Sequence, residues 1–432
     1  MTRRTFEHLT VISTATLLGF LFTWVIYKFH PSGFLGYSLG ATGDTKTLPV
    51  FSVYWSLFDP NDFGSLGTKY LLQSLVFGGI AYFTYLLATR FFPHLRLHAF
   101  LLCCVTPNLV LRIPMPSAML LFTFFILVGT YFTVRFAETE NTNYGLLAGI
   151  FLAITTLTRP SSVFIGLFVF VSLIISFLYS HHWHGLSKAL TRSILPISFV
   201  CLSISCVVLM NHQHHGKAMY SHQSGSQALY WTYPCLSAPT GCGSRPTSAL
   251  NAARSIYNEK AQALGKAPTP PEQNSLETTI AIKLLLAVPL QTLISSSTIS
   301  WIKLATYSSL PEIVYRFTGN HISIHTIYGA FHNGYRPNNH LQLFALTVIA
   351  MSYVINVLFL FFSLYGLYLS FKSPKTFGPA LIIFSMTMAL LLAHIGMGNP
   401  RYRTYIEPFL ILFFLGGFSS FLKALKNKTR VK

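Results

Sequence analysis

The residues best suited to chemistry are one carboxylate and several cations that stand beside apolar segments. Asp44 lies in Gly40-Ala-Thr-Gly-Asp-Thr-Lys46, shortly after the first long apolar run. An acid at a membrane interface meets a lowered dielectric constant, which can raise its pKa into the range of a general base. The alternative for Asp44 is a turn or helix-capping role, as we expect for Asp59 and Asp62 in Asp-Pro-Asn-Asp.

Arginines supply the complementary charge. Arg159 precedes a proline, which favours a helix end there and turns the guanidinium toward the interface. Arg401 and Arg403 flank a single tyrosine. A guanidinium keeps its charge and can bind phosphate through two N–H groups, so we expect these arginines to hold an anion. The alternative is that each of them pairs with Glu407 or reaches a lipid headgroup.

Other polar residues are weaker candidates. His394 lies toward the outer end of an apolar run, and an ionisable group inside a membrane is a functional candidate by default. We interpret Glu407 as the partner that fixes Arg401 or Arg403. The run His212-Gln-His-His215 suggests zinc, but a polar helix end near lipid headgroups is the plainer interpretation. The aromatic run 229–235 could form a wall for a sugar ring or pack at the membrane interface.

A membrane scaffold has to position these residues, and the composition predicts one. The chain has 432 residues, of which 52% are hydrophobic and only 9% charged, with a mean hydropathy of +0.52. These values exclude a disordered chain and an ordinary soluble domain, in which about 25% of residues are charged. Runs of about 20 apolar residues can cross a bilayer. We therefore predict an all-α polytopic membrane protein with about ten transmembrane helices and two large extracytoplasmic loops.

The predicted spans are 9–27, 70–92, 99–113, 116–135, 145–158, 162–180, 193–210, 341–371, 376–396 and 404–422. The third and fifth are the shortest. The first follows Arg3 and Arg4, as in a signal peptide, but its length of about 19 residues exceeds the usual apolar run of about 7 to 15 in a cleaved signal, so we expect a retained anchor.

Lysine and arginine fix the expected orientation, because they gather on the cytoplasmic side of a membrane protein. Both chain ends are then cytoplasmic, together with Arg90, Arg96, Arg135, Lys188, Arg192, Lys372, Lys375 and the basic tail. We divide the chain into an N-terminal transmembrane module with the first outer loop (1–210, loop 28–69), an extracytoplasmic loop with interfacial helices (211–340), and C-terminal transmembrane helices with the cytoplasmic tail (341–432). Within the second loop we interpret 278–307 as one or two interfacial helices, with an eleventh span as the alternative.

The charge of the outer side is unusual. In a soluble protein a net charge of +19 would favour nucleic-acid binding, but so apolar a chain excludes that partner. Arg112, Arg159, Arg401 and Arg403 stand at helix ends that face outward, against the expected distribution of positive charge. An anionic ligand held at the outer membrane surface would explain them.

Two cysteines and one glycosylation signal bear on the compartment. Cys235 and Cys242 fall in the second outer loop, where we expect a disulfide if the compartment is oxidising and two free thiols if it is not. The only N-x-S/T sequon is at Asn427 in the predicted cytoplasmic tail. A large outer loop without sequons favours a bacterial inner membrane, with a site that faces the periplasm, over the endoplasmic reticulum membrane.

Short motifs are spread over nearly the whole chain. They are Gly145-Leu-Leu-Ala-Gly149 through Leu157-Thr-Arg159-Pro160, the preceding helix over 116–135, Gly43-Asp44 in the first loop, and Arg401-Tyr-Arg403 with Glu407-Pro408. Together they resemble the GT-C membrane glycosyltransferases, the polyprenyl-phosphate-sugar-dependent enzymes that include protein O-mannosyltransferases and lipid A aminoarabinose transferases.

The resemblance implies a GT-C fold and an inverting transfer of a sugar from a polyprenyl-phosphate-linked donor to a glycan, lipid or protein acceptor on the extracytoplasmic side, among membrane lipids. It implies that Asp44 is the catalytic base or a ligand of a divalent cation, Mg or Mn. It also implies that basic residues bind the lipid phosphate: Arg159, Arg401 and Arg403, and more loosely Lys46, Lys69 and Arg336. Many members carry an Asp-Glu pair where this chain has Asp44-Thr45, so the metal stays open.

The chemistry is consistent with these residues, because a lipid phosphate is already a good leaving group. The enzyme must orient the donor, neutralise the phosphate and remove a proton from the acceptor.

Two other functions stay open. A secondary transporter or lipid-carrier flippase would show repeated halves with polar residues at the midplane, whereas here the charges lie at the outer edge. A non-catalytic assembly subunit could keep the same fold.

Overall fold

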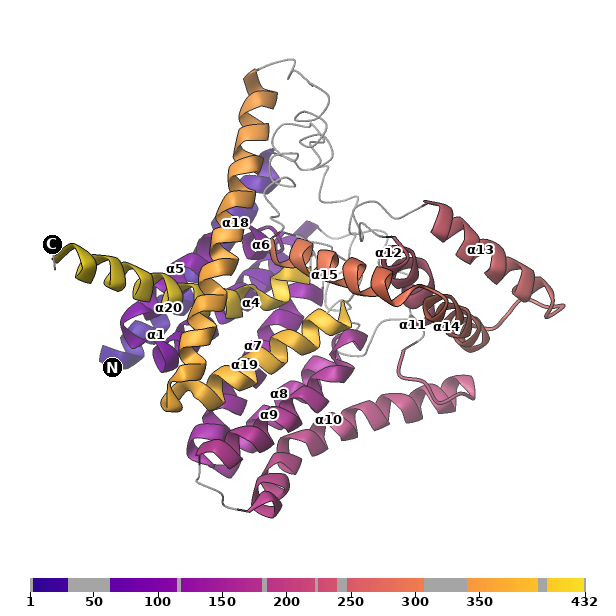
Figure 1. The fold of residues 1–432 in the computed structure, drawn as a ribbon, viewed down its shortest axis with the longest axis horizontal. Coiled ribbons are helices and arrows are strands. Elements are labelled where there is room, and N and C mark those ends of the chain that lie inside the picture. The colour runs from indigo at the N-terminus through magenta and orange to yellow at the C-terminus, as the bar shows by residue number, and fades with distance from the viewer. Residues whose placement is uncertain are drawn as a thin grey trace.

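The protein is helical throughout the residues that the computed structural model describes, which are 3–29, 63–114, 118–180, 185–221, 224–238, 247–306, 340–394 and 402–430. Within these residues there is no strand, as expected where backbone groups must find their hydrogen bonds inside each membrane-spanning segment. Eight helices of this part are long and apolar enough to cross a membrane. They are α1 (Arg3–Phe29), α4 (Phe63–Phe91), α7 (Ala118–Thr139), α9 (Ile165–Ser180), α10 (Leu186–His215), α18 (His340–Lys372), α19 (Pro374–Ala393) and α20 (Arg403–Arg430) (Figure 1). The protein is an all-α polytopic membrane protein.

Two of the ten predicted spans differ in the structure. The third, 99–113, is broken into α5 (Arg96–Val105) and α6 (Pro107–Val110), with the turn η2 (Pro93–Leu95) before them. Thr106 is extended at the break, with ψ of 120°, because a residue before proline is disfavoured in helical geometry. The fifth becomes α8 (Thr142–Thr156), whose 15 residues rise by about 22 Å, less than the roughly 30 Å of a bilayer core. It packs between α7 and α10.

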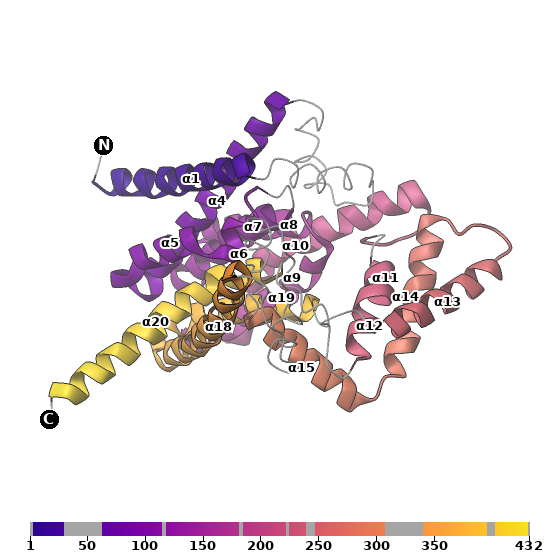
Figure 2. The ribbon, with the colours of Figure 1, turned by 90° about the horizontal axis from the view of Figure 1, so that it is seen from above.

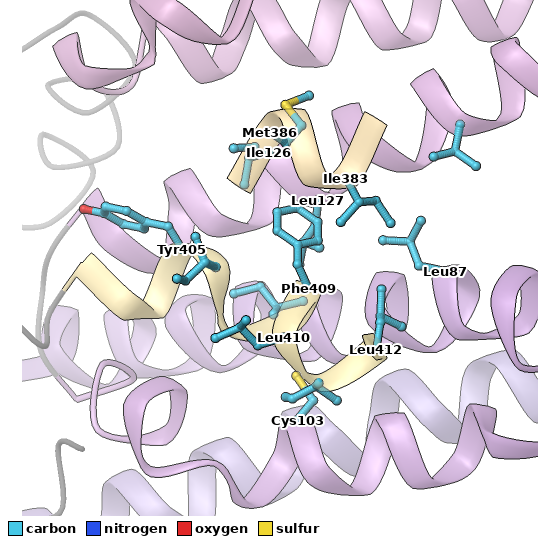
Figure 3. Packing of buried hydrophobic residues seen from close by; sticks show 14 of the residues in the cluster. Leu87, Cys103, Ile126, Leu127, Ile383, Met386, Tyr405, Phe409, Leu410 and Leu412 are labelled. Atoms are coloured by element: carbon cyan, nitrogen blue, oxygen red, sulfur yellow. The ribbon is translucent and has the colours of Figure 1, made fainter. Parts of the chain in front are cut away.

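The first half of helix α20 is buried in the bundle, and its side chains lie among those of α4, α5, α7 and α19 (Figure 3). Phe409, Leu410 and Leu412 of α20 lie in one buried cluster with side chains from its neighbours. These are Leu87 from α4, Cys103 from α5, Ile126 and Leu127 from α7, and Ile383 and Met386 from α19. This packing fixes the start of α20, which carries two of the predicted site residues.

Helices α18 and α20 approach each other backbone to backbone. A Cβ atom added to Gly366 would overlap the carbonyl oxygen of Phe413, and one added to Gly417 would overlap that of Phe362. Small residues permit such close helix contacts in membranes, where packing rather than the hydrophobic effect holds helices together. The two glycines therefore set the distance between α18 and α20.

Ion pairs join several helix ends at one end of the bundle, which we call the basic end. The pairs are Arg96 with Glu7, Arg90 and Arg135 with Glu138, and Arg192 with Glu140. Glu7 of α1 also accepts a hydrogen bond of 2.5 Å from Tyr85 of α4. The sequence predicts a cytoplasmic position for all four of these arginines, and the structure groups them at one end.

A helical lobe, residues 224–238 and 247–306, lies beside the opposite end of the bundle (Figures 1 and 2). It comprises α11 (Ser224–Gln227), the π-helix η4 (Ala228–Thr232), α12 (Tyr233–Leu236), α13 (Thr247–Gln262), α14 (Pro270–Leu286) and α15 (Leu290–Thr306). Its small core contains Leu229, Ala253 and Ile280. Helices α14 and α15 are bent by 109° at the break between them, so the segment predicted as one or two helices is two. Trp301 of α15 donates a 3.1 Å hydrogen bond to the carbonyl of Leu391 in α19.

Candidate functional site

The ends of several elements converge opposite the basic end. They are α6, the end of α8 with the turn η3 (Pro160–Phe164), the end of α19, and the start of α20. Arg159 stands between α8 and η3 with φ of −149° and ψ of 140°, the extended geometry expected before a proline. Ser162 donates a hydrogen bond to the carbonyl of Arg159, and Tyr220 donates one to the carbonyl of Thr156. The corner that carries Arg159 is therefore fixed from both sides.

A buried ion pair lies at the start of α20. Nε of Arg403 is 2.5 Å from Oε2 of Glu407, and Nη2 is 3.3 Å from Oε1, with the two side chains 1% and 3% exposed. Asn108 of α6 donates a 3.1 Å hydrogen bond to Oε2 of Glu407, and Thr404 donates one of 3.1 Å to the carbonyl of Asn108. Buried charges are costly unless hydrogen bonds satisfy them, so this network holds α20 firmly against α6.

Arg159 is held by aromatic rings. Its Cζ lies 5.8 Å from the ring centroid of Tyr402 and 5.4 Å from that of Tyr405, within the range of a cation–π interaction. Nη1 of Arg159 is buried and finds no hydrogen-bond partner among the described residues, and the same holds for the hydroxyl of Tyr405. A buried donor without an acceptor costs free energy. An incoming oxyanion would remove that cost.

His394 forms another wall of the same site. It is buried at the end of α19, with Nδ1 2.8 Å from the carbonyl oxygen of Leu390. Its ring lies against Tyr402, with the centroids 4.2 Å apart. The ring therefore shapes the site beside the two tyrosines.

Arg159 and Arg403 differ in what they can do. The charge of Arg403 is balanced by Glu407, whereas Arg159 has an N–H group with no acceptor within the described part of the chain. A phosphate or another oxyanion at Arg159 would gain a charge-assisted hydrogen bond in a partly desolvated place. The arrangement is thus suited to binding one anion, with Arg403 and Glu407 as its support. Arg112, also singled out as outward-facing, is buried just after α6.

A divalent cation does not fit the described part of this site. Among the described residues no group of three or more His, Cys, Asp or Glu could hold a metal ion. Both carboxylate oxygens of Glu407 are engaged by Arg403 and Asn108, and Nδ1 of His394 lies at a backbone carbonyl.

Several predicted site residues lie outside the described residues: Asp44, Lys46, Arg336, Arg401 and Cys242. Lys69 falls within α4. Cys235 is buried in α12 and forms a disulfide, while its pairing with Cys242 stays a prediction. The structure brings Arg159, Arg403, Glu407 and His394 to one end of the bundle.

Three contributing residues were not singled out from the sequence: Asn108, Tyr402 and Tyr405. Tyr402 and Tyr405 stand three residues apart beside the arginine motif, a spacing that places them on neighbouring positions of a helix face. Asn108 is a polar residue within a predicted membrane span, which was a usable signal because polar groups there need a partner. What the sequence could not supply is that Arg159, far away in the chain, lies against the two tyrosines.

Comparisons with known proteins give similar structures only. No protein family matches the sequence, and no curated protein sequence matches it. One similar structure is the archaeal oligosaccharyltransferase AglB from Archaeoglobus fulgidus in complex with an inhibitory peptide and a dolichol-phosphate, at 14% identity and a TM-score of 0.49, covering 98% of this chain and 52% of that one. Another is an Archaeoglobus fulgidus oligosaccharyltransferase tethered to an acceptor peptide with the NVT sequon, at 12% and 0.49, covering 99% and 51%.

A third similar structure is an Archaeoglobus fulgidus oligosaccharyltransferase in complex with Zn and sulfate, at 12% identity and a TM-score of 0.47, covering 96% of this chain and 49% of that one. The chain thus spans about half the length of these structures. At TM-scores below 0.5 the likeness carries no argument about function, which has to come from the residues of the chain.

Proposed function

We propose that the protein is an integral-membrane glycosyltransferase that transfers a sugar from a polyprenyl-phosphate-linked donor to an acceptor at the end of the bundle opposite the basic end. The observation that carries the proposal is Arg159. Its guanidinium lies over the rings of Tyr402 and Tyr405, and it has a buried N–H group for which no described residue supplies an acceptor. A cation at the end of a membrane bundle can hold the phosphate of a lipid whose chain lies in the bilayer. The GT-C resemblance of the surrounding motifs supplies the reaction.

In the proposed reaction one bond forms and one breaks. The hydroxyl oxygen of the acceptor attacks the anomeric carbon of the sugar, and the bond between that carbon and the phosphate oxygen breaks. The lipid phosphate leaves with the electron pair, and the acceptor proton passes to the carboxylate of Asp44 as general base. A single displacement inverts the configuration at the sugar carbon. The role of Asp44 is taken from the sequence resemblance.

Arg159 acts on the leaving group in this scheme. The donor phosphate is a diester with one negative charge, and it leaves as a monoester that carries more negative charge. A guanidinium fixed in place stabilises the charge that develops during the transfer. Arg403 and Glu407 are positioning residues, because they hold the start of α20 and with it the two tyrosines that support Arg159.

The distribution of charge supports an extracytoplasmic position for the site. The arginines of the basic end are those that the positive-inside rule assigns to the cytoplasm. The opposite end, with Arg159, then faces outward. We assign the protein to the bacterial inner membrane, with the endoplasmic reticulum membrane as the alternative.

Mass spectrometry of carrier lipids and envelope glycans tests the proposal. The strains compared lack the protein or express wild type, Arg159→Gln, Asp44→Asn or Arg254→Gln, the last removing an exposed arginine of the helical lobe. In the strain that lacks the protein and in the Arg159→Gln and Asp44→Asn strains, we expect one polyprenyl-linked sugar to accumulate and one acceptor to lose that sugar. The wild-type and Arg254→Gln strains should show neither change. Identical glycans in every strain would contradict the proposal. Movement of the lipid-linked sugar across the membrane without a new glycosidic bond would identify a transporter instead.

A further inference from the structure

A second site lies between α5 and α20, away from Arg159. These helices contact each other and extend toward the side of the molecule where the labelled chain ends lie (Figures 1 and 2). Between them is a groove of about 590 Å³, a volume typical of small-molecule sites. Apolar side chains line most of it: Leu101, Leu102 and Val105 from α5, and Phe414, Phe418 and Leu422 from α20.

Helix α5, which forms one wall of the groove, is about as long as one leaflet of a bilayer is thick. Helix α5 has 10 residues, which rise by about 15 Å, roughly half of a hydrocarbon core of about 30 Å. It begins at the basic end, where Arg96 pairs with Glu7, whereas α20 ends there. The groove therefore runs from the basic end to about the middle of the bundle, as a lipid acyl chain of that leaflet does.

The mouth of the groove is cationic. Lys423 and Lys426 of α20 and His98 of α5 line it at the basic end. Deeper in, Leu101 and Val105 remain 55% and 68% exposed, so the protein itself leaves this surface to be covered. None of the lining residues, all of them within the described part of the chain, is acidic. The groove thus combines an apolar channel with a positive mouth at headgroup level.

We propose that this groove binds one anionic glycerophospholipid of the leaflet at the basic end. An acyl chain lies along α5 and α20, and the headgroup phosphate lies at Lys423 and Lys426. Charge complementarity favours an anionic headgroup over a zwitterionic one, because the two lysines attract the phosphate and no lining carboxylate attracts a choline cation. The proposal is independent of the sugar transfer, since no residue of the groove belongs to the site at Arg159.

Photo-crosslinking of the full chain tests this proposal. The protein is reconstituted into phosphatidylcholine nanodiscs that contain a small fraction of either phosphatidylglycerol or phosphatidylcholine with a diazirine on the acyl chain. After illumination, cross-linked peptides are mapped by mass spectrometry. We expect phosphatidylglycerol to label α5 and α20 roughly ten- to thirtyfold more than phosphatidylcholine does, as expected for two lysines near an anionic lipid.

Matched variants separate this site from general charge attraction. Lys423→Gln/Lys426→Gln should reduce the labelling by phosphatidylglycerol to the level of phosphatidylcholine. Lys372→Gln/Lys375→Gln removes the same charge near the α18–α19 turn and should leave the preference intact. For the apolar channel, Leu101→Trp should lower the labelling by both lipids. Leu97→Trp, at a position that does not line the groove, should not.

Two results would overturn the proposal. One is the absence of a specific headgroup site. It would be shown by equal labelling of α5 and α20 by the two lipids, or by an equal loss of phosphatidylglycerol labelling in the two double-lysine variants. The other is the exclusion of both lipids from these helices, which would mean that protein, such as a second copy of this chain, covers the groove. Retention of the helical circular dichroism spectrum shows that each variant is folded.

Discussion

The ion pair of Arg403 and Glu407 gives a prediction at the scale of single residues. Glu407→Gln leaves the guanidinium of Arg403 buried without its counterion, so the free energy of unfolding should fall by about 3 to 5 kcal/mol. Thermal or denaturant unfolding of the purified protein in detergent measures this loss. Arg403→Met/Glu407→Leu removes both charges and should lie closer to wild type than either single variant does. If the loss of unfolding free energy in the double variant equals the sum of the losses in the two single variants, the two side chains do not stabilise each other.

The sequence predicted part of the site at this scale. Arg403 and Glu407 stand four residues apart, a spacing at which side chains on a helix meet, and Glu407 was proposed as a partner for one of the arginines. The proline after Arg159 predicted the helix break that the structure has. The contact of Arg159 with Tyr402 and Tyr405 depends on how α8 and α20 pack, which a single sequence does not specify.

At the scale of helices, the contact of α18 with α20 gives a second stability prediction. Gly366→Ala and Gly417→Ala each place a methyl group against a backbone carbonyl of the facing helix, so each should lower the free energy of unfolding by about 1 to 3 kcal/mol. Gly185→Ala is the control, because a Cβ atom there meets nothing within 4 Å. Thermal unfolding in detergent compares the three variants. Equal melting temperatures would show that the two helices do not make this contact.

The sequence predicted the helices far better than their breaks. Long apolar runs identify eight of the described helices as membrane-spanning, because a helix of about twenty apolar residues matches the thickness of the bilayer core. The third span was predicted as one helix, although Thr106 and Pro107 lie in it, and the proline is what separates α5 from α6. The bend between α14 and α15 falls close to Pro289. The sequence left open whether this segment forms one helix or two.

At the scale of the whole molecule, the orientation is the prediction on which the placement of both sites depends. Lys188 lies at the start of α10 at the basic end, and Lys217 follows the other end of the same helix. With a cysteine at either position, a membrane-impermeant maleimide added to intact spheroplasts should label position 217 and not position 188. The wild-type protein measures the background from its own cysteines. The reverse pattern would place Arg159 in the cytoplasm and contradict the proposed function.

The two proposed anion sites lie at opposite ends of the molecule, with different surroundings. Arg159 lies among aromatic rings where several helix ends meet, as suits the phosphate of a reacting donor. Lys423 and Lys426 line an open apolar groove at the basic end, as suits a lipid that stays bound. Loss of one site should leave the other intact, because the two share no described residue.

Direct binding of a polyprenyl phosphate tests the proposed role of Arg159. The affinities of undecaprenyl phosphate and of undecaprenol are measured for the full chain in nanodiscs, with wild type, Arg159→Gln and Arg254→Gln side by side. Wild type and Arg254→Gln should prefer the phosphate by roughly ten- to a hundredfold, as expected of a charge-assisted hydrogen bond, and Arg159→Gln should lose that preference. Equal preference for the phosphate in Arg159→Gln and wild type would contradict the claim that Arg159 binds the lipid phosphate.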